Sequence, residues 1–285
     1  MSTYTVTVVG PTGKTGRHVA RYAVERGWTV RAAARRKPDH GTFVPFDWDN
    51  TRTWTAAFTG SHAAYVLIPF NHPGAPERTP ELLRVAARSA IARIVLLSSL
   101  DVDSAEPDSP LRTAERALES LPVTAAILRP TWFLDNFTVG SFLPMTHAGD
   151  LRLPAGEGAI PFVDARDVAA VAVAALAPDG PSGPLPITGP EPLTHHQVAQ
   201  ALGAALGRPV RYTPTSPAEF IELMTHHGFT VDYSQFLADA LADVATGALR
   251  IPVTDTVHRL LGRPAYSIKE FSTHYARRCS GQTGQ

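Results

Sequence analysis

The sequence predicts an α/β protein built on a doubly wound parallel sheet, with a smaller, mostly helical subdomain towards the C-terminus. From Thr3 to about Leu128, short apolar runs rich in β-branched residues alternate with amphipathic stretches, the pattern of βαβ units. A glycine-rich turn follows the first run. Beyond residue 190 helix-start signals dominate. These three observations set the fold class.

The expected strands are short apolar runs, several of them apolar on both sides of the alternation, as strands covered by helices on two faces must be. They span residues 4–9, 28–34, 42–46, 63–68, 93–97, 124–128 and 185–188. Strands separated by helical segments predict a parallel sheet whose carboxyl ends share one edge.

Helix-start chemistry marks the segments between and after the strands. A first helix is expected over residues 18–26, and Thr79-Pro80 has the form of an N-cap followed by proline at the first helical position. Asp164 and Asp167 begin an Ala/Val-rich helix that runs to about residue 177 and should be buried. Two capping boxes follow, at 194–197 and 216–219.

The predicted domains are a nucleotide-binding domain over 1–150, to which 160–190 return, and a smaller helical subdomain over 191–285. The chain has 285 residues, enough to bury a core without disulfides or metal. Lys plus Arg and Asp plus Glu both number 26, so the net charge is zero. The chain therefore has no overall positive electrostatic field that would attract nucleic acid or an anionic membrane.

Cysteine occurs once, at Cys279, so neither an intrachain disulfide nor a cysteine-rich metal site can form. We find no targeting segment and no long apolar stretch. A cytoplasmic protein without a membrane partner is therefore expected, and its oligomeric state is left open.

The turn after the first strand reads Gly10-Pro11-Thr12-Gly13-Lys14-Thr15-Gly16 and leads into a predicted helix. Glycines let the backbone approach a diphosphate, and a helix N-terminus attracts anions. A P-loop would need glycine at position 8, which is Val8. The turn instead suits a Rossmann-type dinucleotide site, in which Gly10, Gly13 and Gly16 shape the loop and Thr12, Lys14 and Thr15 line it.

The end of the second strand indicates which dinucleotide binds. Arg35 lies 19 residues after Gly16, and Arg36 follows it. NAD enzymes place an acidic residue there, whereas arginine suits the 2′-phosphate of NADP(H). The sequence therefore favours NADP(H). Asp47, after the third strand, is predicted either to accept a bond from the adenine amino group or only to form a turn.

Several segments in this order resemble the NmrA-like branch of the atypical short-chain dehydrogenases/reductases. They are the glycine turn, Phe46-Asp-Trp-Asp49, Ile94-Val-Leu-Leu-Ser-Ser99, Ile127-Leu-Arg-Pro-Thr-Trp-Phe-Leu-Asp-Asn-Phe137, Pro161-Phe-Val-Asp-Ala-Arg-Asp167 and Ile187-Thr-Gly-Pro190. The resemblance covers nearly the whole chain. It implies a Rossmann domain with a discontinuous substrate domain and NADP(H) at the carboxyl ends of the strands.

The resemblance also implies which loops flank the nicotinamide half of the cofactor. The implied cofactor contacts are Leu67, Ile68, Pro69, Ser98, Ser99, Pro130, Trp132 and Phe133, with Arg112 a candidate for the cofactor ribose. The implied substrate contacts are Phe70, His72, Leu100, Asn136 and Phe137. At helical spacing Phe133 and Phe137 are more often core residues, and a histidine such as His72 is more often a solvated loop residue.

One departure from the wider superfamily bears on the chemistry. The Tyr-x-x-x-Lys pair that donates a proton would fall near Asp108 and Arg112, and no tyrosine occurs between Tyr65 and Tyr212. Arginine cannot be tuned to relay a proton. The expected activity is hydride transfer from NADPH to a small conjugated or cationic acceptor such as a quinone, an imine or iminium ion, or an enone. No catalytic residue is assigned.

Two alternatives remain open: a dinucleotide-binding regulator without turnover, and a non-redox cyclase or isomerase on the same scaffold. No metal site is expected, because the adjacent pairs His195-His196 and His226-His227 point about 100° apart on a helix. Asp164 and Asp167 resemble a catalytic carboxylate pair, but helix-start chemistry explains them better.

Overall fold

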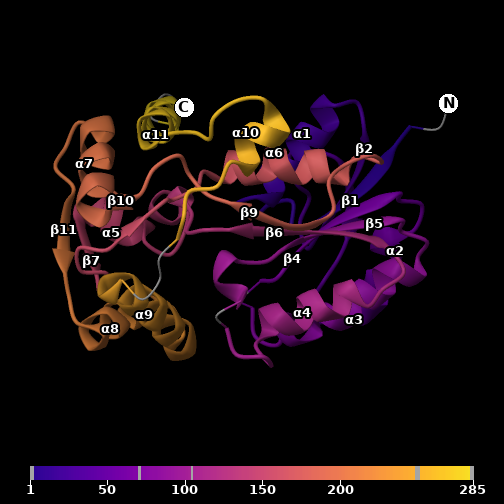
Figure 1. Cartoon of the computed structure of the whole chain (residues 1–285), viewed down its shortest axis with the longest axis horizontal. Coiled ribbons are helices and arrows are strands. Elements are labelled where there is room, and N and C mark those ends of the chain that lie inside the picture. Colours follow the sequence, from indigo (N-terminus) through magenta and orange to yellow (C-terminus); the bar gives the residue numbers. More distant parts are fainter. Residues whose placement is uncertain (1–2, 70–71, 104, 248–250, 283–285) are drawn as a thin grey trace. The chain divides into compact units, whose positions relative to one another are not determined.

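Residues 3–69, 72–103, 105–247 and 251–282 are described by a computed structural model of the chain (Figure 1). Contacts divide the chain into two compact units. The first comprises Met1–Pro130, Ala165–Ile187 and Asp255–Arg263, and the second Thr131–Asp164, Thr188–Thr254 and Pro264–Gln285. In the described part, no helix is long and apolar enough to cross a membrane.

A seven-stranded, wholly parallel sheet forms the centre of the first unit, in the order β3-β2-β1-β4-β5-β6-β9. The strands are β1 (Thr5–Val9), β2 (Thr29–Ala34), β3 (Thr42–Pro45), β4 (Ala63–Leu67), β5 (Arg93–Leu97), β6 (Thr124–Pro130) and β9 (Gly183–Ile187). This order reverses between β1 and β4, which is the Rossmann arrangement. The predicted fold class is confirmed, and the expected strands agree with the observed ones within two residues.

Helices cover both faces of this sheet (Figure 1). One face carries α1 (Gly16–Glu25), α6 (Ala165–Leu176) and α10 (Thr256–Leu261), and the other α2 (Trp54–Phe58), α3 (Ala75–Arg88) and α4 (Pro110–Glu119). Trp54, Phe58, Leu82 and Ile94 are fully buried in the core on the α2–α4 side. Each such side chain contributes about 1.5 to 3 kcal/mol by leaving water. Burial on both faces explains why the strands read as continuous apolar runs.

Helix α6 is held at its C-terminal end by hydrogen bonds and at its N-terminal end by an ion pair. Arg93 of β5 is buried and donates to the carbonyls of Ala175, Pro178 and Pro181, at 3.1, 3.3 and 3.0 Å. The last carbonyls of a helix lack partners within the helix, so this guanidinium satisfies the Ala175 carbonyl and joins the helix end to the loop that follows it. At the other end, buried Asp167 forms an ion pair with Arg263 at 2.7 Å, a structural role.

The predicted start of α3 is wrong. Its N-cap is Gly74, in the left-handed region with φ 74°, and Pro80 lies inside the helix rather than at its first position. Thr79 is buried and donates its hydroxyl to the Ala75 carbonyl at 3.0 Å. A hydroxyl bonded one turn back cannot cap. Pro76 in the first turn is the proline that needs no N–H partner.

The second unit contains α5 (Leu143–Ala148), α7 (His195–Leu206), α8 (Pro217–His226), α9 (Val231–Thr246) and α11 (Ile268–Gln282). Both predicted capping boxes, Thr194 with Gln197 and Ser216 with Glu219, are confirmed. Two strand pairs that the sequence analysis missed complete this unit. They are β7 (Asp150–Leu153) parallel to β11 (Arg211–Pro214), and β8 (Ala159–Ile160) antiparallel to β10 (Leu193–Thr194).

The limits of the two units differ in detail from the predicted domains. Residues 131–150 belong to the second unit, although the prediction places them in the nucleotide-binding domain, and Asp255–Arg263 returns to the first unit with α10. The assignment of functions to domains stays a prediction.

Candidate functional site

The glycine turn between β1 and α1 folds tightly on itself. Gly10 has φ 71°, and a Cβ there would lie 2.7 Å from Cδ2 of Leu67. Gly13 donates its N–H to the Gly10 carbonyl at 3.0 Å. A Cβ on Gly16 would collide with the same carbonyl. Gly10 and Gly16 are therefore required by space or by backbone conformation, whereas a Cβ on Gly13 would lie 3.3 Å from the Gly10 carbonyl oxygen. Helix α1 begins immediately against the turn.

The N-terminus of α1 has no side-chain cap, and the N–H groups of Arg17 and His18 in its first turn donate to the carbonyls of Gly13 and Thr15, at 3.2 and 2.9 Å. Thr15 is its N-cap but makes no side-chain cap bond, and the first turn contains no acidic residue. The N–H groups and partial positive charge of a helix start favour phosphate or carboxylate ligands. Of the predicted lining residues, Thr12 is exposed and Lys14 is half-buried.

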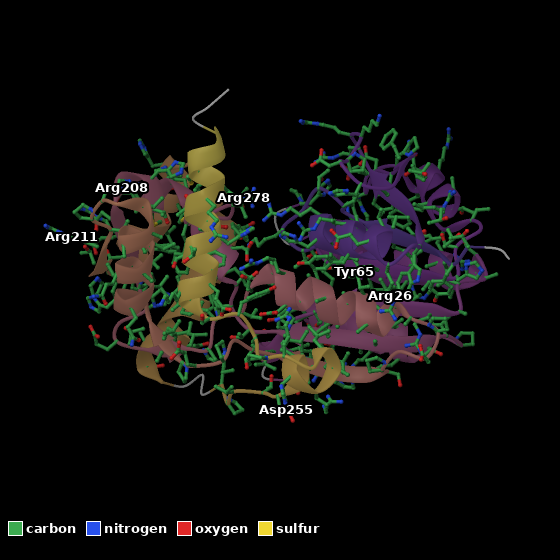
Figure 2. All side chains as sticks on the ribbon, turned by 90° about the horizontal axis from the view of Figure 1, so that it is seen from above. Arg26, Tyr65, Arg208, Arg211, Asp255 and Arg278 are labelled. Atoms are coloured by element: carbon green, nitrogen blue, oxygen red, sulfur yellow. The ribbon has the colours of Figure 1, made fainter. Side chains whose placement is uncertain are left out.

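The side chain of Thr15 forms a hydrogen bond with a residue of the neighbouring strand β4. Its hydroxyl lies 2.7 Å from the hydroxyl of Tyr65 on β4. Tyr65 is fully buried within the first unit, where Figure 2 labels it, and burial raises the pKa of its phenol. The hydrogen bond joins the glycine turn to the neighbouring strand. A lone tyrosine within an aliphatic strand was the signal that could have revealed this support.

Arg35 and Arg36 leave the sheet beside the glycine turn. Strands β1 and β2 are adjacent, with Val9 paired to Ala33, and Gly10 donates its N–H to the Ala33 carbonyl at 3.1 Å. Both arginines are exposed, and among the described residues neither forms an ion pair. Lys37, which the sequence analysis did not single out, is exposed in the same way. These cations could hold a phosphate group.

Asp47 lies at the end of β3 and forms a turn. Its Oδ1 accepts the N–H of Asp49 at 3.0 Å, and its carbonyl accepts Nε1 of Trp54 at 2.8 Å. Thr53 Oγ1 accepts the Asp47 N–H at 3.0 Å. The turn thus uses one carboxylate oxygen of Asp47 as a hydrogen-bond acceptor. The contact of Asp47 with the adenine stays a prediction.

A charged group formed by Asp49, His72 and Arg78 lies next to Asp47. Arg78 Nη1, from α3, donates to Asp49 Oδ1 at 2.6 Å and to the Trp48 carbonyl at 3.1 Å. His72 Nε2 lies 3.4 Å from Asp49 Oδ2. Ligand atoms of Asp47, Asp49 and His72 lie within 4.8 Å of one another. A metal ion there would have to displace the Arg78 guanidinium, so the donor set does not favour one.

The next strand ends carry the residues predicted near the nicotinamide. After β4, Ile68 is buried and Leu67 and Pro69 are half-buried. After β5, Ser98 donates its N–H to Leu128 of β6 at 2.8 Å. Ser98 is 7% exposed, and its Oγ has no hydrogen-bond partner in the described part of the chain. A buried hydroxyl without a partner costs free energy, which a bound ligand could recover. Ser99 and Leu100 follow it, half-buried.

Arg112, the candidate for the ribose, faces a buried ion pair instead of open solvent. Its Nη1 lies 3.2 Å from Glu115 Oε2 on the same helix, α4. Glu115 is fully buried and also accepts two bonds from Arg129, at 2.6 and 3.1 Å. These bonds raise the pKa of Arg129. Arg112, where the sequence analysis expects the superfamily lysine, is therefore part of a charge network, while Asp108 is exposed before α4.

The remaining predicted residues belong mainly to the second unit. Phe137 is fully buried in its core, with ring centroids 5.4 Å from Phe142 and 5.8 Å from Phe162. Trp132 and Asn136 are half-buried, as is Phe133. Phe137 therefore has the core environment that the sequence allowed as an alternative. Pro130 is buried at the end of β6, and Phe70 lies outside the described residues.

The model of the NmrA-like family matches residues 2–244. The chain belongs to this family. An oxidoreductase named YesF, from Bacillus subtilis, is 32% identical over 276 residues, which cover 95% of each chain. The NAD(P)H azoreductase of Xenophilus azovorans is 31% identical, covering 95% of this chain and 98% of its own length.

A solved structure has a fold similar to that of this NmrA-like chain. It is the NADPH-dependent quinone oxidoreductase QOR2 of Escherichia coli complexed with NADPH, with a TM-score of 0.78. The sequence identity is 20%, and the match covers 94% of this chain and 99% of QOR2. At this identity the likeness concerns the fold. The sequence analysis named the family correctly. It missed the contacts of Tyr65 with Thr15, of Arg78 with Asp49, and of Glu115 with Arg129, because the partners lie apart in the sequence.

Proposed function

We propose that the chain is an NADPH-dependent oxidoreductase that transfers hydride to a small conjugated or cationic acceptor. The observation that carries the proposal is the tight glycine turn at the start of α1, which has no side-chain cap, beside Arg35 and Arg36, which form no ion pair in the described part of the chain. The turn would hold the diphosphate, and the arginines the 2′-phosphate through charge-assisted bonds. NADPH, when bound, supplies the hydride.

The names of the relatives support this class of reaction, since they include an NAD(P)H azoreductase and an oxidoreductase. The residues of this chain limit the chemistry further. Asp108 and Arg112 stand where a proton-donating pair would be, and Arg112 is engaged with Glu115. Acceptors that are already electrophilic need little acid assistance, and alignment alone can supply about 7 to 11 kcal/mol of the barrier.

Ser98 is the residue of this site best suited to orient a bound molecule. Its hydroxyl is buried at the carboxyl end of β5 and has no partner among the described residues. A hydroxyl both donates and accepts hydrogen bonds, so it suits a carboxamide or an acceptor oxygen. The neighbouring walls of the nicotinamide site would be formed by Leu67, Ile68, Pro69, Ser99 and Pro130. Asp47 would contact the adenine.

The experiment that tests the proposal follows the absorbance of NADPH in the presence of a quinone, an azo dye, an iminium ion and an enone. Consumption of NADPH with at least one acceptor is the expected result. Binding without consumption by any acceptor would favour a regulator. Conversion of a substrate at constant NADPH would favour a cyclase or isomerase. Failure to bind either coenzyme would overturn all three assignments.

A further inference from the structure

The charged group of Asp49, His72 and Arg78 has no role in the proposed reaction, although it lies beside the predicted phosphate ligands. Strands β2 and β3 are adjacent, with Ala34 paired to Pro45, and Phe46 donates its N–H to the Ala34 carbonyl at 3.0 Å. Arg35 continues the first strand and Asp49 follows the second. The two side chains therefore start from neighbouring strand ends.

Asp49 lies close enough to Arg35 for the two charges to interact. The bond from Arg78 holds the pKa of its carboxyl below the usual range, and the charges of His72 and Arg35 act in the same direction. Its side chain is 58% exposed, so it faces solvent as well as Arg78. An unpaired carboxylate here would repel a phosphate dianion and could instead accept a bond from a ribose hydroxyl.

We infer that Arg78 is a specificity-determining residue that sets the preference for NADPH over NADH. By neutralising the charge of Asp49, it allows Arg35 and Arg36 to bind the 2′-phosphate. The inference rests on the proposed function, since it concerns the same cofactor site. Arg78 acts through Asp49 and is a positioning residue with an electrostatic effect. Its second bond, to the Trp48 carbonyl, fixes the guanidinium against the turn.

The test compares four variants in calorimetric titrations with NADPH and NADH at low salt and about pH 8. They are Arg78→Met, Asp49→Asn, the double variant, and Arg84→Met as the matched control. Arg84 is exposed on the same helix and forms no ion pair in the part of the chain described. Arg84→Met therefore removes a positive charge from α3 without freeing Asp49.

Arg78→Met should raise the Kd for NADPH about tenfold and leave that for NADH within about twofold, because it exposes the Asp49 charge. The double variant should regain most of the lost NADPH affinity. Asp49→Asn alone should tighten NADPH binding and spare NADH. Arg84→Met should change both by less than about twofold.

A merely structural role for Arg78 would weaken both coenzymes equally. Equal losses, or a double variant that stays as weak as Arg78→Met, would overturn the inference. Should Arg78→Met not fold, Asp49→Asn decides, since unchanged NADPH affinity there also overturns it. A wild-type chain that binds neither coenzyme would overturn the proposed function together with the inference, whereas normal wild-type binding with equal losses would overturn the inference alone.

Discussion

Each unit contains buried ionisable groups, and three of them show two opposite ways of accommodating such a group. In the first, buried charges are paired: Glu115 with Arg129, and Asp167 with Arg263. In the second, His195 is fully buried among Phe137, Phe162 and Tyr212, at centroid distances of 6.1, 5.3 and 5.4 Å. Neither ring nitrogen of His195 has a partner among the described residues. The two pairs of the first unit thus depend on charges being present, whereas the packing around His195 depends on a charge being absent.

This difference fits the chemistry that each unit carries. The first unit leaves Arg35, Arg36 and Lys37 exposed at strand ends, where an anion could bind, and holds neighbouring elements by ion pairs. The second unit packs the rings of Phe137 from η3 (Leu134–Phe137), Phe162, and Tyr212 from β11 around one imidazole. Charge removal should therefore damage the first unit, and protonation the second.

The largest effect should come from the exposed arginines. Changing Arg35 and Arg36 to Ala should weaken NADPH binding by about 1.5 to 3 kcal/mol for each charged hydrogen bond lost, or about 3 to 6 kcal/mol together. NADH, which has no 2′-phosphate, should be nearly unaffected. Calorimetric titration measures both. Equal weakening of the two coenzymes would contradict the assignment of these side chains.

Breaking the buried pair should come next. Glu115→Leu should lower the free energy of unfolding by about 3 to 5 kcal/mol, because it leaves Arg129 buried without its main partner. Urea unfolding measures the loss. Glu119→Leu is the matched control on the same helix, because its carboxylate is 45% exposed and its ion pair with Arg112 is long, at 3.9 Å. Similar losses from both changes would mean that burial of the pair is unimportant.

Acid should act on the second unit. Burial lowers the pKa of His195 to about 4 from 6.5, with a smaller effect from His196. Because the unfolded chain takes up this proton first, stability is complete above about pH 6.5 and falls as the pH drops towards 4, by about 3 kcal/mol at most.

His195→Phe should remove this part of the acid sensitivity, since phenylalanine suits the aromatic surroundings and takes no proton. Unfolding by urea at several pH values between 7 and 4 measures the difference between the variant and the wild type. His227→Gln, at an exposed position in the same unit, is the control. Parallel pH profiles of His195→Phe and the wild type would show that another group governs the acid response.

The smallest effect concerns the support of the glycine turn. Tyr65→Phe removes the bond to Thr15 and should cost about 0.5 to 1.5 kcal/mol of stability. Thr15 would then lack its buried partner, so coenzyme affinity should fall slightly and equally for NADPH and NADH. Thermal unfolding and calorimetry measure the two effects. A selective loss of NADPH would assign Tyr65 a place in phosphate recognition that its burial does not suggest.

The sequence by itself determined the parallel sheet, the glycine turn, both capping boxes and the family. These features depend on local patterns: apolar runs for strands buried on both faces, glycines where a Cβ cannot fit, and side chains that satisfy N–H groups three residues away. The start of α3 was predicted wrongly because Thr79-Pro80 has the local form of a cap while burial of Thr79 decides otherwise.

Only the tertiary structure decided which distant side chains meet. Arg78 reaches Asp49 across 29 positions of sequence, Tyr65 reaches Thr15 across 50, and the aromatic shell of His195 is drawn from separate segments. The short strand pairs of the second unit likewise join residues about 60 positions apart in β7 and β11. No local periodicity encodes such contacts, because they depend on how whole elements pack, and charge pairing and burial follow from that packing.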